Sequence, residues 1–225
     1  MSARQLKLAT ESLSFGVDGR SILRNVDLRV ATGETVTIVG PSGAGKSTLL
    51  RLLCRLDEPT GGTVYLDGTE YRTLDPTALR ARVGMVPQDP ALRDGTVRDN
   101  VTVGPQLRGE TVAPDQVETL LKRVGLADYA DRSAADLSGG EAQRVAIART
   151  LMVDPEVILL DEPTASLDPE SQSEIEALLR ALLADSDRTV VLVTHDQAQV
   201  DRVADRVVEF VDGQIRGRGS PREVV

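Results

Sequence analysis

The chain has 225 residues, of which 40% are hydrophobic and 27% charged, so it is long and apolar enough to bury the core of one folded domain. Its formal net charge of −9 argues against a free-standing nucleic-acid-binding protein, whose surface is usually basic, and we expect no nucleic-acid partner. No apolar run approaches the roughly 20 residues that cross a bilayer, and the N-terminus lacks the apolar segment of a secretory signal, so we expect a cytoplasmic protein.

The order of the predicted elements is that of an α/β protein. Residues 5–30 have the pattern of alternating antiparallel strands. Four later runs are short, apolar and β-branched, as in strands buried on both faces: 35–39, 83–86, 157–160 and 189–193. A helix is predicted from Asp168, with Pro169 in its first turn, and a hairpin near the end turns at Asp212-Gly213.

Two further predictions concern the rest of the chain. Segment 88–136 has no long buried strand and several short helical patterns, so we expect it to form a subdomain. The single cysteine, Cys54, lies among leucines, and we expect it to be a small buried hydrophobic residue without a functional role.

The clearest site is the stretch GPSGAGKS, which follows the predicted strand at 35–39 and opens a helix. This is the pattern and setting of a P-loop, in which glycines let backbone N–H groups converge on phosphate oxygens. Lys46 would supply a cation for the β- and γ-phosphates, and Ser47 a hard oxygen for Mg²⁺. The alternative is a simple glycine-rich turn. The predicted nucleotide-binding residues are Gly40, Pro41, Ser42, Gly43, Ala44, Gly45, Lys46, Ser47 and Thr48.

Two adjacent carboxylates, Asp161 and Glu162, end the predicted strand at 157–160. Open parallel sheets bind their ligands at the carboxyl ends of the strands. Asp161 would hold Mg²⁺ through water, and Glu162 would orient and activate the attacking water as a general base. In isolation such residues are more often caps or solvated groups, so this interpretation depends on the P-loop.

A second glycine-bearing helix start lies at LSGGE, far downstream of the P-loop. Ser138 can cap a helix and Glu141 follows three residues later, so the stretch alone is explained by a capping box. The longer context points further: LSGGEAQRVAIAR, followed after a short gap by VILLDEPTASLD, resembles the signature, Walker B and D-loop succession of ABC-type ATPases. GPSGAGKS matches the Walker A motif of that family, Gln88 its Q-loop glutamine and His195 its switch histidine.

The resemblance covers essentially the whole chain and implies a P-loop NTPase fold. Such a fold has a mainly parallel central sheet flanked by helices, an N-terminal antiparallel β-subdomain and an inserted α-helical subdomain. A single ABC ATPase domain would then span 1–225. Residues 1–87 and 157–225 would form the catalytic core, and about 88–156 the helical subdomain with the signature helix.

The resemblance also implies an ATPase that uses ATP and Mg²⁺ at a site shared by two copies of the chain. Because two such domains meet head to tail in that family, Ser138, Gly139 and Gly140 of one copy would hold the γ-phosphate of the nucleotide on the other copy's P-loop. This homodimer explains why the second helix start needs no lysine of its own.

Four more residues take roles from the same resemblance. Phe15 would stack on the adenine, although the family more commonly has tyrosine there, and Phe15 could instead be a core residue. Gln88 would contact Mg²⁺ or the lytic water, and His195 would touch the γ-phosphate and position that water. Asp168 would bridge the dimer as well as capping its own helix.

ATPase domains of this size usually attach to integral membrane permease subunits, which would dock here on 88–136 and hold the chain at the inner face of the cell membrane. DPALRDGTVRDNVTVGPQLRG resembles the corresponding segment of exporter-type members that handle metals or, in plants, nucleotide sugars, and phosphate and amino-acid importers share much of it. The cargo therefore stays open among a metal ion, phosphate and another small solute.

Two other functions explain the sequence less completely. A soluble, non-transport ABC ATPase of the repair or translation type would require a long coiled-coil insertion, a zinc hook or two cassettes, and this sequence has none of them. The acidic net charge also disfavours that function. A small-molecule P-loop kinase would leave LSGGE and His195 unexplained.

Overall fold

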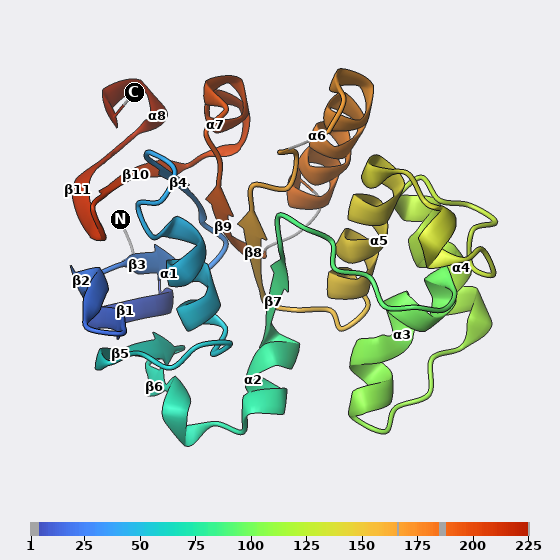
Figure 1. Ribbon diagram of the computed structural model, residues 1–225, viewed down its shortest axis with the longest axis horizontal. Coiled ribbons are helices and arrows are strands. Elements are labelled where there is room, and N and C mark those ends of the chain that lie inside the picture. Colours follow the sequence, from blue (N-terminus) through green and yellow to red (C-terminus); the bar gives the residue numbers. More distant parts are fainter. Residues whose placement is uncertain (1–4, 166, 185–187, 225) are drawn as a thin grey trace.

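The computed structural model describes residues 5–165, 167–184 and 188–224, and a six-stranded sheet forms its centre (Figure 1). The strand order is β11-β10-β4-β9-β8-β7, parallel from β10 to β7, with β11 antiparallel to β10. The strands are β4 (Thr35–Val39), β7 (Val83–Val86), β8 (Val157–Asp161), β9 (Thr189–Val193), β10 (Arg206–Val211) and β11 (Gln214–Gly219). The four predicted buried strands and the hairpin at Asp212-Gly213 are confirmed.

Both faces of the central strands are buried, as their continuous apolar character predicts. In β8, Val157 and Leu159 belong to one hydrophobic cluster, whereas Ile158 and Leu160 belong to a second. Alternate residues of a strand point to opposite faces, so the sheet separates the two clusters. The first cluster packs the sheet against α1 (Lys46–Leu53) and the N-terminal strands, and the second packs it against the helices of the other half.

A second sheet is antiparallel and lies at one end of the molecule. Its strand order is β2-β1-β5-β6, with β3 also paired to β1. The strands are β1 (Leu6–Val17), β2 (Arg20–Val26), β3 (Arg29–Ala31), β5 (Gly61–Leu66) and β6 (Thr69–Glu70). The prediction for residues 5–30 is confirmed, whereas β5 and β6 did not stand out from the sequence.

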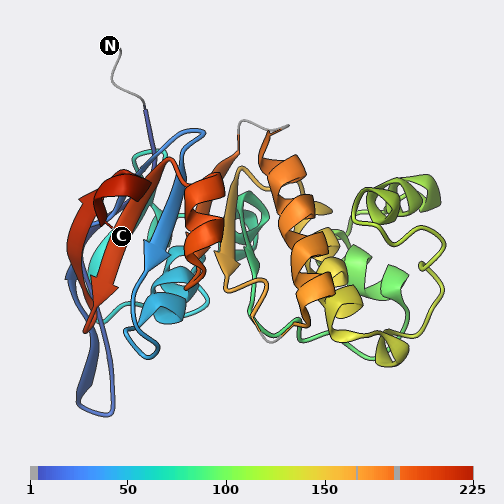
Figure 2. The same cartoon turned by 90° about the horizontal axis from the view of Figure 1, so that it is seen from above.

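Helices occupy the opposite end of the molecule, so that the antiparallel strands and helices α3 and α4 lie at the two ends of its long axis (Figures 1 and 2). Segment 88–136, which the structure describes throughout, holds helices and no strand, as expected. None of the helices in the described ranges is long and apolar enough to cross a membrane. The remaining helices are α2 (Pro76–Arg82), α3 (Val97–Leu107), α4 (Pro114–Arg123), α5 (Gly139–Leu151), α6 (Pro169–Ala184), α7 (Gln197–Val203) and α8 (Pro221–Val224), with short 3-10 turns at Tyr71–Thr73 and Ala134–Asp136.

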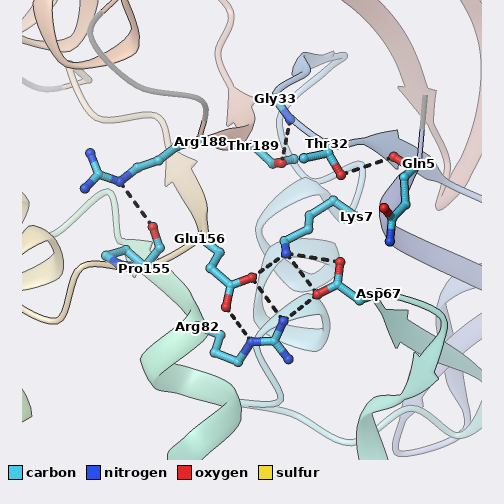
Figure 3. A network of polar contacts seen from close by, with 10 residues as sticks. All are labelled: Gln5, Lys7, Thr32, Gly33, Asp67, Arg82, Pro155, Glu156, Arg188 and Thr189. Atoms are coloured by element: carbon cyan, nitrogen blue, oxygen red, sulfur yellow. Dashed lines mark hydrogen bonds and ion pairs between the residues drawn. The ribbon is translucent and has the colours of Figure 1, made fainter. Parts of the chain in front are cut away.

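A network of ion pairs ties the two sheets together at the edge away from the P-loop (Figure 3). Lys7 of β1 lies 2.9 Å from Asp67, and Arg82 at the end of α2 lies 2.7 Å from Glu156, just before β8. Lys7 also pairs with Glu156, and Arg82 with Asp67, which closes the network. Hydrogen bonds from Arg82 and then Lys7 lower the pKa of the Glu156 carboxyl to about 2.

We expect Glu156→Gln to lower the free energy of unfolding by about 1 kcal/mol at pH 7, a value reduced for solvent screening because the Glu156 side chain is 44% exposed. A carboxyl whose folded-state pKa is depressed contributes stability above its ordinary pKa of 4.5 and loses it as the pH falls toward about 2. The difference between variant and wild type should therefore shrink between pH 5 and pH 3 in urea unfolding, within roughly the window set by that shift. Glu118→Gln, which removes a partly exposed contact at 3.3 Å with Arg98, is the control and should cost under about 0.5 kcal/mol. An equal loss at both pH values would contradict this role for Glu156.

Candidate functional site

The P-loop connects β4 to α1 at the carboxyl end of the central sheet. Gly40 follows β4 with a φ of 150°, and a Cβ atom there would lie 1.9 Å from the Phe210 carbonyl oxygen of β10, so only glycine fits. Gly45 begins α1 with a left-handed φ of 99°, and none of the described side chains caps this helix start. The backbone N–H groups of the first turn are therefore available to an anion.

Lys46 is folded back over this loop. Its side chain is 5% exposed, and Nζ donates to the carbonyl oxygens of Gly40 at 2.8 Å and Pro41 at 3.0 Å. The same Nζ lies 4.0 Å from Glu162 Oε1. A buried cation held by flexible methylenes and by carbonyl dipoles can turn toward a phosphate without leaving the site.

Ser47 and Asp161 form a pair of hard oxygen donors. The Ser47 hydroxyl, in the first turn of α1, donates at 2.9 Å to Oδ1 of Asp161, the last residue of β8. Asp161 is 5% exposed, and burial raises the pKa of its carboxyl above its ordinary value, so its charged form gains from a nearby cation. No group of three or more His, Cys, Asp or Glu side chains in the described residues could hold a metal. This donor set suits Mg²⁺, which binds one or two protein oxygens together with substrate phosphates.

Glu162 and His195 contact each other beside the P-loop. His195 Nδ1 lies 3.0 Å from Glu162 Oε2, and the backbone N–H of Glu162 donates to the Val193 carbonyl oxygen at 2.9 Å. Glu162 has a left-handed φ of 44°, a strained conformation for a residue with a Cβ atom, and such strain is typical of functional sites. The carboxylate therefore sits between Lys46 and an imidazole that is 70% exposed.

One cavity of about 610 Å³ gathers most of the predicted nucleotide site. The P-loop from Ser42 to Thr48 lines it together with Gln88 and Glu162. Asp161 and His195 do not line the cavity themselves, but Asp161 is hydrogen-bonded to Ser47 and His195 contacts Glu162. The structure thus brings together residues from the ends of β4, β7, β8 and β9, and their individual roles stay predictions.

Phe15 lies outside this cavity. It is a half-buried residue of β1 that packs against the first hydrophobic cluster and lines a separate hollow of about 520 Å³. Arg20, Ser21 and Arg24 line both this hollow and the P-loop cavity, so the two spaces adjoin. Stacking of Phe15 on a base stays a prediction.

The signature residues lie outside the P-loop cavity. Ser138 caps α5 through the predicted box: its Oγ accepts from the Glu141 N–H at 3.3 Å, and Glu141 Oε2 accepts from the Ser138 N–H at 2.7 Å. Asp168 is exposed and caps α6 by accepting from the Ser171 N–H at 3.0 Å. A Cβ atom at Gly140 would lie 2.5 Å from Ser171 Oγ, so the two helix starts touch. Neither of them lines the P-loop cavity.

Sequence reasoning missed several residues of the cavity, namely Arg20, Arg24 and the β10–β11 turn at Asp212 and Gly213. Gly213 donates its N–H to the Ala44 carbonyl oxygen at 3.0 Å, and a Cβ atom on it would lie 2.0 Å from the Ile22 carbonyl oxygen. The turn itself was predictable from Asp212-Gly213, but its contact with the P-loop depends on β10 pairing with β4.

Comparison with known proteins places these features in one family. The family model described as ABC transporter matches residues 23–165. The chain is 49% identical over 199 residues to "ABC transporter I family member 17" of Arabidopsis thaliana. This alignment covers 88% of the chain and 76% of the plant protein. It is 46% identical over 231 residues to "Phosphate import ATP-binding protein PstB 2" of Natronomonas pharaonis, covering 96% and 81% of the two chains.

A solved structure agrees with these matches. CbiO1 of Clostridium perfringens, described as part of the ABC transporter complex CbiONQ, superposes with a TM-score of 0.84 at 32% identity. The superposition covers 98% of this chain and 91% of CbiO1.

Proposed function

Because the chain belongs to the ABC transporter family, as an ATP-binding subunit with ATPase activity, we propose that it hydrolyses Mg²⁺-bound ATP between two copies arranged head to tail. Each copy would contribute its P-loop cavity to one nucleotide and its α5 helix start to the other. Binding of ATP would favour the closed dimer, and hydrolysis with loss of phosphate would release it.

The separation of the two phosphate-binding elements is the observation that supports this proposal. Ser138, Gly139 and Gly140 do not line the cavity formed by Lys46 and Glu162. The capping box of this helix start uses the N–H groups of Ser138 and Glu141 and leaves those of Gly139 and Gly140 for an anion, which would lie on the P-loop of a second copy. Asp168, at the start of the helix that touches Gly140, would lie at the same interface.

Within one site, each side chain has a distinct task. Lys46 would turn from its carbonyl partners to the β- and γ-phosphates, where its charge opposes the charge that develops during transfer. Glu162 would accept a proton from the attacking water, and His195, 3.0 Å away, would hold that water and the γ-phosphate in line. Phe15 would hold the adenine in the adjoining hollow.

Ser47, Asp161 and Gln88 would hold the magnesium ion. When bound, the ion supplies positive charge that neutralises the phosphate oxygens. Ser47 and Asp161 are already within hydrogen-bond distance of each other, and Gln88 lines the same cavity.

ATP-binding subunits of this family work with membrane permeases, and we propose that the permease docks on segment 88–136. Leu107, at the end of α3 in this segment, is the most exposed of the large hydrophobic side chains in the described residues, at 76%. This docking would place the chain at the inner face of the cell membrane. The cargo is a small solute, and the similarity to a phosphate import subunit makes phosphate the first to test.

A mixing experiment tests the shared site. Lys46→Ala and Ser138→Arg variants should each lack ATPase activity alone. After mixing, each heterodimer pairs one intact P-loop with one intact α5 start, so activity should recover to about a quarter of the wild-type value if subunits pair at random. Steady-state phosphate release measures this.

The control uses two variants broken in the same element. Lys46→Ala mixed with Ser47→Ala should stay inactive, because every site in that mixture has a damaged P-loop. Ser138→Arg protein that hydrolyses ATP at the wild-type rate while strictly monomeric would contradict the shared site.

A further inference from the structure

The backbone around Gln88 is held by side chains of α5. Gln143 Nε2 donates to the Pro87 carbonyl oxygen at 3.2 Å, on one side of Gln88. Arg149 Nη2 donates to the Pro90 carbonyl oxygen at 2.8 Å, on the other side. Gln143 is 2% exposed, so its bond is shielded from water. Gln88 itself is exposed toward the cavity, while the chain on both sides of it is bonded to one helix.

The hydrogen-bond partners of the Arg149 guanidinium are backbone carbonyl oxygens of the segment that follows Gln88. Burial lowers the pKa of its guanidinium, and within the described residues no carboxylate contributes to its environment. Its Nη1 also donates to the Ala91 carbonyl oxygen at 3.3 Å. Ala91 has a left-handed φ of 44°, which costs free energy for a residue with a Cβ atom. The planar guanidinium thus holds two successive carbonyls of a strained turn.

The same helix also packs directly on the strand that leads to Gln88. The Thr150 hydroxyl donates to the Met85 carbonyl oxygen of β7 at 3.1 Å. A Cβ atom at Gly84 would lie 2.7 Å from Thr150 Cγ2, so a larger residue would push α5 away. The capping residue Ser138 begins this very helix. Gln88 and Ser138 are therefore attached to one rigid element.

We propose that Arg149 is a positioning residue for Gln88: by holding Pro90 and Ala91 it keeps Gln88 aimed into the P-loop cavity and makes it move with α5. Arg149 does not line that cavity, so it acts through the backbone and touches no nucleotide. The proposal rests on the proposed function, in which the start of α5 completes the neighbouring nucleotide site. Closure of one site then sets the position of Gln88 in the other.

A double-mutant cycle tests whether Arg149 affects the rate of ATP hydrolysis through Gln88. Arg149→Met, which keeps a long side chain without donors, should lower kcat about tenfold with the KM for ATP changed less than about twofold. Arg149→Lys, which can reach one carbonyl, should restore at least about a third of the wild-type kcat. In a Gln88→Ala background, Arg149→Met should have less than about a twofold effect, because the side chain that it positions is gone. An equal tenfold loss in both backgrounds would show a general structural role and overturn the proposal.

The mobility of the loop that contains Gln88 can be measured without ATP turnover. Cys54 is buried, and burial raises the pKa of its thiol to about 11, so a nitroxide will label Asp89→Cys selectively. Arg149→Met should shorten the rotational correlation time of this label at least about twofold, whereas the control Arg108→Met, which removes an exposed pair with Glu110, should leave it unchanged. An unchanged spectrum in Arg149→Met overturns the proposal. Failure of the proposed function would appear separately, as Ser138→Arg protein that hydrolyses ATP at the wild-type rate while strictly monomeric.

Discussion

Glu162→Gln is expected to lower kcat for ATP hydrolysis about a thousandfold, within the range of ~10²–10⁴ for loss of a general base, while ATP still binds. The amide has nearly the size of the carboxylate and can still contact His195, which lies 3.0 Å from Glu162 Oε2, but it cannot accept the proton of the attacking water. Nucleotide should then persist in the closed state, so the variant should accumulate as a dimer in ATP and Mg²⁺. Single-turnover kinetics and size-exclusion chromatography measure the two effects.

Glu209→Gln is the matched control, because Glu209 lies on β10 of the same sheet and does not line the P-loop cavity. It should turn over ATP within about twofold of wild type, as expected for a residue without contact to the reacting atoms. A Glu162→Gln protein that keeps more than a tenth of wild-type kcat, or that stays monomeric in saturating ATP, would remove Glu162 from the proposed chemistry.

Lys46→Ala should weaken ATP binding by about a hundredfold, since removing one partner of a buried, hydrogen-bonded charge pair costs ~2–5 kcal/mol. The side chain is 5% exposed, so water cannot replace the lost cation efficiently. The change also leaves the carbonyl oxygens of Gly40 and Pro41 without this donor. Equilibrium titration with a fluorescent ATP analogue measures the loss.

Lys122→Ala serves as the control, because Lys122 is exposed at the end of α4 and does not line the cavity. Its affinity for the analogue should equal that of wild type. If Lys46→Ala bound the analogue as tightly as this control, the P-loop lysine would have no part in holding the phosphates.

The strands and the phosphate-binding loop were predictable because local patterns determine them. The runs at 35–39, 83–86, 157–160 and 189–193 are continuous and apolar, and all four became strands of the central sheet. GPSGAGKS was recognisable because its glycines, Lys46 and Ser47 form one continuous pattern, and the left-handed φ of 99° at Gly45 is a local conformation that glycine adopts readily. The position of Asp161 near the nucleotide site was also predictable, because parallel sheets bind their ligands at the carboxyl ends of the strands.

The rest depends on contacts between distant segments, which carry no local signal. The sheet order β10-β4-β9-β8-β7 determines which strand ends are neighbours, and it does not follow from the strand patterns one by one. Arg149 reads as an ordinary helix residue until its bonds to Pro90 and Ala91 are seen, 58 or more positions earlier in the chain. Phe15 is similar: its side chain lines a hollow beside the P-loop cavity, and only the folded chain brings the two spaces together.

The turn at Asp212 and Gly213 has a consequence for how the protein is made. Gly213 bonds to Ala44 of the P-loop and, through its carbonyl oxygen, to Arg24 of β2, while β10 lies directly against β4. During synthesis on the ribosome, the P-loop emerges long before this hairpin does. A nascent chain that has folded everything up to β9 therefore still lacks one wall of its nucleotide cavity, and we expect ATP to stabilise the fold more strongly once the hairpin has docked.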